Sequence, residues 1–101
     1  MNPMQRMLAN AKRMERELKK AHEELATKEF VVKKAGIIEV TIMGDRKIKA
    51  IKIDKDALSA DNEEMVEETL AMAINEAYDK VQAESDAIEE RVTGQRGVLG
   101  F

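Results

Sequence analysis

The chain has 101 residues, of which 37% are charged and 3% are aromatic, and its formal net charge is −3. This length corresponds to one domain with a lean core, and the composition favours completion of that core by oligomerisation. The lack of cysteine excludes a disulfide framework and a cysteine-based metal or redox site. The sequence has no apolar run of about 18 residues and its start does not resemble a signal peptide, so we expect a cytoplasmic protein without a membrane partner.

The net charge conceals a strong asymmetry between the two halves. Residues 1–55 carry 14 Lys/Arg and 8 Asp/Glu, whereas residues 56–101 carry 3 and 12. A basic half favours a polyanionic partner. The alternative is that the two halves neutralise each other within a dimer.

The first segment predicts a long amphipathic helix, with Pro3 in its first turn. Apolar residues alternate three and four apart over about three heptads, which is typical of a coiled-coil or bundle seam. These residues are Met4, Met7, Ala11, Met14, Leu18, Ala21 and Leu25. The first twenty residues also carry six basic and two acidic side chains, which is more basic excess than a solvated helix face requires.

Three short antiparallel strands are expected next, at about 28–34, 37–43 and 47–54, because β-branched residues alternate there and Gly36 and Gly44 separate them. A three-residue turn at 44–46 would place Ile42 opposite Ile48 and Val40 opposite Ala50. A β-bulge near Ala50–Ile51 would then allow Ile38 to pair with Ile53 and Glu39 with Lys52.

A second long helix is predicted from about 62 to 92, with Asp61 and Glu64 as a capping box and Gly94 at its end. At about 45 Å it is longer than a small sheet requires, so part of it should project or pack on another subunit. The domain is therefore expected to span 1–93, followed by a flexible tail at 94–101. The predicted class is α+β, in the order α-β-β-β-α.

The sequence offers little for catalysis. His22 is the single histidine and cannot form a zinc site alone, and neither Ser59 nor Ser85 lies in a nucleophile motif. A calcium loop starting at Asp54 fails, because Leu58, Ser59 and Met65 occupy positions that need ligands or glycine. We therefore expect no enzyme, no cofactor, no metal and no small-molecule substrate.

Two classes of interaction protein remain. One is a dimeric protein that contacts the backbone of duplex DNA with a basic surface. Single-strand binding is disfavoured because Phe30, Tyr78 and Phe101 are the only aromatic residues. The alternative is a protein-only dimeric adaptor that docks a partner through its amphipathic helices.

The order of motifs resembles the YbaB/EbfC family of bacterial nucleoid-associated proteins. The resemblance rests on the Met-rich first helix, on "AGIIEVTIMGDRKIKAIKID" at 35–54, and on an acidic helix start followed by "LAMAINEAYDKV" at 70–81. It implies a tweezer-like homodimer that binds duplex DNA with weak sequence preference, alters DNA conformation, and acts in nucleoid organisation and gene regulation. Two positions depart from the family pattern, because Ala35 and Arg46 stand where glycine is frequent. If their φ angles are positive, each costs about 1 kcal/mol.

The candidate DNA contacts rest on charge placement. The primary set lies on the first helix: Arg6, Lys12, Arg13, Arg16, Lys19 and Lys20. Possible secondary contacts lie in the strand region: Lys33, Lys34, Lys47 and Lys49. Three lysines lie on the predicted third strand or next to it: Lys47, Lys49 and Lys52. We expect them to stay solvated and to prevent the sheet edge from pairing with another chain, more than to serve as main DNA contacts.

Overall fold

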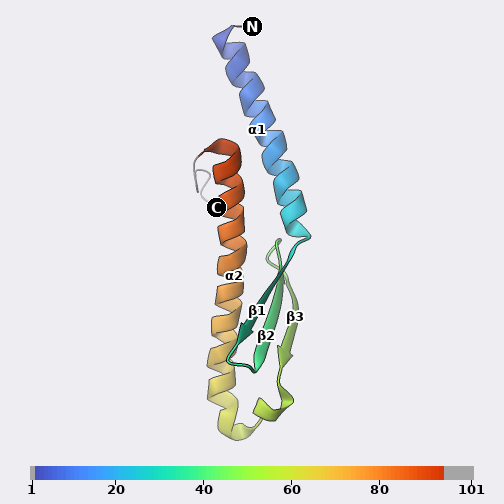
Figure 1. Cartoon of the computed structure of the whole chain (residues 1–101), viewed down its shortest axis with the longest axis vertical. Helices are drawn as coiled ribbons and strands as arrows, with labels where there is room; N and C mark the ends of the chain where they lie inside the picture. The colour runs from blue at the N-terminus through green and yellow to red at the C-terminus, as the bar shows by residue number, and fades with distance from the viewer. Residues whose placement is uncertain (1, 95–101) are drawn as a thin grey trace.

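A computed structural model describes residues 2–94. The elements run in the order α1 (Pro3–Ala26), β1 (Glu29–Lys34), β2 (Ile38–Met43), β3 (Ile48–Ile53), the 3₁₀ turns η1 (Lys55–Ala57) and η2 (Ala60–Asn62), and α2 (Glu63–Thr93). This confirms the predicted α-β-β-β-α class. The molecule is a rod of 70 × 20 × 15 Å, with α1 extending from one end (Figure 1). The predicted tail falls largely at 95–101, outside the described residues.

The start of α1 and the end of α2 are fixed by capping residues. Asn2 caps α1: its side chain accepts from Gln5 N at 2.8 Å, and the Gln5 side chain accepts from Asn2 N at 3.0 Å. Pro3 occupies the first turn as predicted. Gly94 ends α2 with a φ of 79°, and its N–H donates to the Glu90 carbonyl at 2.8 Å, as predicted.

The predicted capping box at the start of α2 is wrong. Asn62 occupies the N-cap position, and its side chain makes no capping hydrogen bond. Asp61 lies inside η2, where Asn62 N donates to the Ser59 carbonyl at 3.0 Å. A capping side chain normally projects from extended backbone. Because the 3₁₀ turn leads directly into α2, Asp61 is not in that position.

The sheet has the order β1-β2-β3 and is antiparallel throughout. Ile38 pairs with Ile53, Glu39 with Lys52 and Ile42 with Ile48, as predicted. The bulge lies closer to the turn than predicted, because the register shifts between Thr41 and Ile42. Lys49 is the extra residue, and the predicted pairing of Val40 with Ala50 is wrong.

That correction has a physical reason. Val40 is completely buried and pairs with Ile51, so the central strand keeps an apolar neighbour at this position. With the bulge at Lys49, a lysine that needs solvent takes the irregular position. The register is therefore set by the apolar face of the sheet, which a one-residue slip would reverse.

The core lies between α2 and the first two strands (Figure 1). Val32, Ile38, Val40 and Ile42 form the sheet side of this core, and Ala73, Ala77 and Val81 form the helix side. The two alanines allow the α2 backbone to approach the sheet closely. On β3 the side chains are less protected: Ile51 is 42% exposed, and Ile48 and Ile53 are half-buried.

Gly44, at the β2–β3 turn, packs against the C-terminal end of α1. A Cβ atom at this position would lie 1.8 Å from the Leu25 carbonyl oxygen. Gly44 N also donates to the Lys28 carbonyl at 2.9 Å. The base of α1 therefore rests directly on the β2–β3 turn, and this close approach requires a residue without a side chain.

Both positions that depart from the family pattern have positive φ, 54° at Ala35 and 70° at Arg46, so the backbone keeps a glycine-type geometry without glycine. Left-handed backbone is strained for residues other than glycine. We therefore expect Ala35→Gly to stabilise the protein by about 0.5–1 kcal/mol, since relief of strain exceeds the added entropy of the unfolded chain. Thermal unfolding would show a rise in Tm of a few degrees. An unchanged or lower Tm would mean that the turn tolerates alanine without strain.

Candidate nucleic-acid interface

The seam of α1 is covered at only one end of the helix. Leu25 is buried and Leu18 is half-buried where α1 packs beside the end of α2. Met4 and Met7 are 71% and 69% exposed, because the first half of α1 extends beyond α2 (Figure 1). The N-terminal half of α1 thus projects with its apolar side uncovered in the single subunit.

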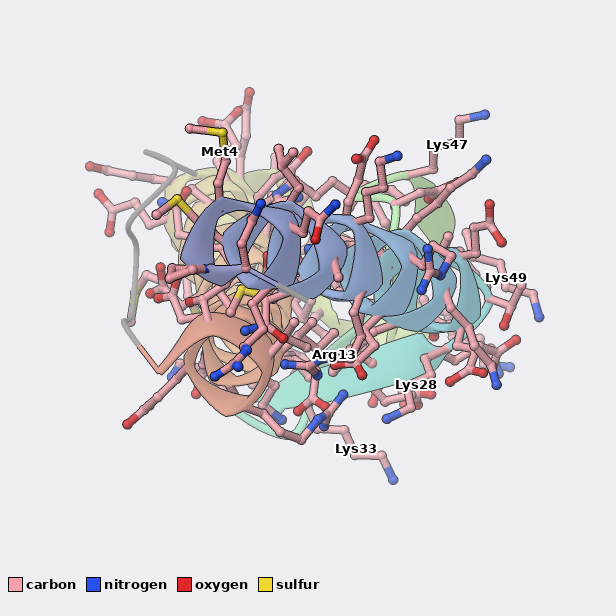
Figure 2. All side chains as sticks on the ribbon, turned by 90° about the horizontal axis from the view of Figure 1, so that it is seen from above. Met4, Arg13, Lys28, Lys33, Lys47 and Lys49 are labelled. Atoms are coloured by element: carbon pink, nitrogen blue, oxygen red, sulfur yellow. The ribbon has the colours of Figure 1, made fainter. Side chains whose placement is uncertain are left out.

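The basic side chains of α1 share the opposite face. All six primary candidates are exposed: Arg6, Lys12, Arg13, Arg16, Lys19 and Lys20. Arg6, Arg13 and Lys20 are seven residues apart, so they recur about every 10.5 Å on nearly the same side of the helix. Met4 and Arg13 project from opposite sides of α1 (Figure 2). We call this set of six the α1 basic face.

Arg13 makes the one ion pair within this face that joins two described residues. Its Nη1 lies 2.9 Å from Glu17 Oε1, one helical turn away, and both side chains are about half exposed. Exposed pairs at this spacing contribute little to stability. A phosphate group can therefore replace Glu17 as the partner of Arg13 at small energetic cost.

The four secondary candidates differ in whether they form an ion pair with another described residue. The Lys34 ammonium lies 2.9 Å from Glu76 Oε2, and this hydrogen bond, with the lysine charge, lowers the pKa of Glu76. Lys49 pairs with Glu29. The first pair links β1 to α2 and the second links β3 to β1, and both are partly exposed, so each contributes little to stability. Lys33 and Lys47 are exposed.

The directions of these side chains distinguish them further. Lys33 projects toward the same side of the molecule as Arg13, whereas Lys47 projects toward the opposite side (Figure 2). Lys28 also lies on the Arg13 side, although its Nζ is 3.6 Å from Glu84 Oε1. Lys28 is not among the predicted contacts. The sequence predicts it at the start of the first strand, but it lies in the short connection between α1 and β1. Lys33 is the secondary candidate that best extends the α1 basic face.

One cluster of acidic residues in the second half lies far from the basic face. Five exposed carboxylates surround the start of α2: Asp61, Glu63, Glu64, Glu67 and Glu68. This start lies at the opposite end of the rod from the N-terminus of α1 (Figure 1). Over such a distance their repulsion of a phosphate bound at α1 is screened at physiological salt.

Other kinds of site find little support within residues 2–94. No group of three or more His, Asp or Glu side chains there could hold a metal ion. Nor does either long helix contain, within that range, a stretch apolar enough to cross a lipid bilayer. His22 is half-buried on α1.

The fold and this surface define a small helix–sheet–helix protein that presents a projecting basic helix. The chain belongs to the YbaB/EbfC DNA-binding family, whose model matches residues 1–96. A nucleoid-associated protein of Metamycoplasma arthritidis is 41% identical over 85 residues, covering 84% of this chain and 88% of the relative. A nucleoid-associated protein of Enterococcus faecalis is 31% identical over 102 residues, covering 100% and 96% of the two chains.

Proposed function

We propose that this protein is a nucleoid-associated protein that binds duplex DNA with weak sequence preference, through phosphate contacts from the α1 basic face and Lys33. One observation carries the proposal: six exposed cations lie on one face of a projecting helix, and the acidic cluster lies at the other end of the rod. Contacts of this kind position a protein on DNA without reading its bases.

The proposal includes a homodimer, because the lean composition leaves apolar surface uncovered on α1 and β3. Two subunits would present two basic faces, so one duplex could be held at two points and bent or bridged. This supports roles in nucleoid organisation and gene regulation, in the cytoplasm where the nucleoid lies.

The test is a fluorescence-anisotropy titration of labelled duplexes at several salt concentrations. If the six cations of one α1 basic face and Lys33 all displace counterions, log affinity should fall against log salt with a slope of about −6. Two duplexes of unrelated sequence should differ only a few-fold in affinity. Equal binding at low and high salt, or strong discrimination between the duplexes, would contradict the proposal.

A second candidate function is a protein-only adaptor. The exposed Met4, Met7 and Leu8 favour it, because an uncovered apolar helix face can dock a partner helix. A folded dimer that shows no DNA binding even at low salt would select this alternative.

A further inference from the structure

The first half of α1 is uncovered on every side within its own subunit. Residues 2–13 are all exposed, because this half of the helix extends beyond α2 (Figure 1). An α-helix with its side chains is about 10–12 Å across, and the major groove of B-DNA is about 12 Å wide. This half of α1 therefore has the width of an element that enters the major groove.

Asn10 lies on this half of the helix, among the cations of the α1 basic face. It follows Arg6 by four residues and precedes Arg13 by three, and residues at these spacings are neighbours on one face of a helix. All three side chains are exposed. The other cations nearby form a second row, about a third of a turn around the helix: Lys12, Arg16 and Lys19.

The amide of Asn10 has no structural role among residues 2–94. Asn2 and Gln5, the other amide side chains at this end of the chain, bind each other's backbone in the capping box. The Asn10 side chain forms no hydrogen bond with a described residue. Asn10 is also not one of the seven seam residues, so it does not set the register of a helix pair as a buried asparagine can. Because asparagine is a poor helix former, its place inside this helix points to a ligand outside the subunit.

The segment around Asn10 carries no negative charge. The first acidic residue of the chain is Glu15. On the side of α1 that carries Asn10, the next acid is Glu17, which lies about 10.5 Å further along the helix and is paired with Arg13. Residues 2–14 can therefore approach a duplex without repulsion between carboxylates and phosphates.

An asparagine in the major groove has a specific target. Its amide can accept from the N6 amino group of adenine and donate to N7 at the same time, and no other base presents this pair of groups. The asparagine side chain is short, so it reaches a base only when the helix lies inside the groove. Arginine and lysine side chains are longer and can reach phosphates from the same helix.

We propose that Asn10 binds adenine in the major groove and determines the weak sequence preference of this protein. The inference rests on the proposed function and assigns one residue of the same surface to base recognition. Arg6 and Arg13, about one helical turn before and after Asn10, hold the helix on phosphates on both sides of that base. The preference is weak because one amide reads one base pair, whereas the phosphate contacts bind any sequence.

The test uses one mixed-sequence duplex in three chemical forms, with binding measured by fluorescence anisotropy. In the second form 7-deazaadenine replaces every adenine, which removes the N7 acceptor but keeps base pairing and the minor groove. In the third form 7-deazaguanine replaces every guanine. The wild-type protein should bind the 7-deazaadenine duplex about fivefold more weakly than the unmodified duplex, the loss expected for one hydrogen bond. The 7-deazaguanine duplex should change its affinity by less than about twofold, because phosphate contacts do not read guanine.

Asn10→Ala should bind the unmodified and 7-deazaadenine duplexes with equal affinity and keep the salt dependence of the wild-type protein. Alanine is the better helix former, so the circular dichroism of this variant should stay helical. Asn75→Ala is the matched control, because Asn75 is an exposed asparagine on α2. The control variant should still discriminate between the two duplexes.

The outcomes separate this inference from the proposed function. Equal wild-type affinity for all three duplexes, with a steep salt dependence, would overturn base reading by Asn10 and keep the phosphate contacts. Equal losses with both modified bases would assign the effect to duplex shape and also overturn the inference. An Asn10→Ala variant that still discriminates against 7-deazaadenine would overturn the assignment to Asn10. A wild-type protein that binds none of the duplexes at low salt would refute the proposed function and this inference together.

Discussion

Replacing Arg13 and Arg16 together by glutamate is expected to lower affinity for duplex DNA by about a hundredfold or more at low salt. The double reversal removes two cations from the middle of the α1 basic face and adds two anions beside the phosphates. The salt dependence should also become shallower, with the slope of log affinity against log salt reduced by about 2. Anisotropy titration of the variant at three or more salt concentrations provides both values.

The matched control for this variant is Lys52→Glu with Lys55→Glu. It changes the net charge by the same amount but alters exposed lysines away from α1. If both variants lose affinity equally, overall charge governs binding and the α1 basic face is not the site. Circular dichroism of the Arg13/Arg16 variant should remain helical. The glutamate introduced at position 16 would gain an attractive neighbour in Lys20, which offsets the repulsion between the glutamate introduced at position 13 and Glu17.

Gly44→Ala is expected to destabilise the fold by about 2–3 kcal/mol, a value typical of overpacking in a tight contact. The added methyl would overlap the Leu25 carbonyl, so α1 must move away from the hairpin turn. Thermal unfolding should show Tm lowered by about 10 °C or more. In the variant, the backbone hydrogen bond from position 44 to the Lys28 carbonyl should weaken as well. Faster amide hydrogen exchange at position 44 than in the wild-type protein would detect this.

Gly36→Ala separates steric overlap from backbone strain. Gly36 has a φ of 70°, but no atom lies within 4 Å of the position that its Cβ would take. The Gly36→Ala variant should therefore lose only about 1 kcal/mol of folding free energy, because alanine is strained in left-handed backbone. An effect at Gly44 no larger than at Gly36 would mean that the α1–hairpin contact can relax freely.

The secondary structure followed closely from local patterns. The three-four spacing of Met4 through Leu25 and the alternation in 37–43 are short-range signals. The three strands and the second helix begin and end within one residue of prediction. The bulge and the α2 cap were misplaced because each depends on tertiary context. Burial of Val40 fixes the register, and the 3₁₀ turn before Glu63 displaces Asp61.

The candidate site was only partly predictable for the same reason. Charge spacing identifies the α1 basic face, because it depends on helical geometry alone. The sequence does not show that Lys34 pairs with Glu76, 42 residues later, or that Lys33 projects beside Arg13 (Figure 2). The exposed edge of β3 depends on where α2 crosses the sheet, which the α2 sequence does not specify.

The contact at Gly44 also makes α1 a lever arm. The helix has 24 residues and so is about 36 Å long, yet it is held only near its C-terminal end. A tilt of about 10° at this pivot moves the tip by about 6 Å, close to the width of the minor groove. Small rotations at the Leu25–Gly44 contact therefore become groove-sized movements of Arg6, and the stiffness of that pivot sets how closely the basic face can follow a curved duplex.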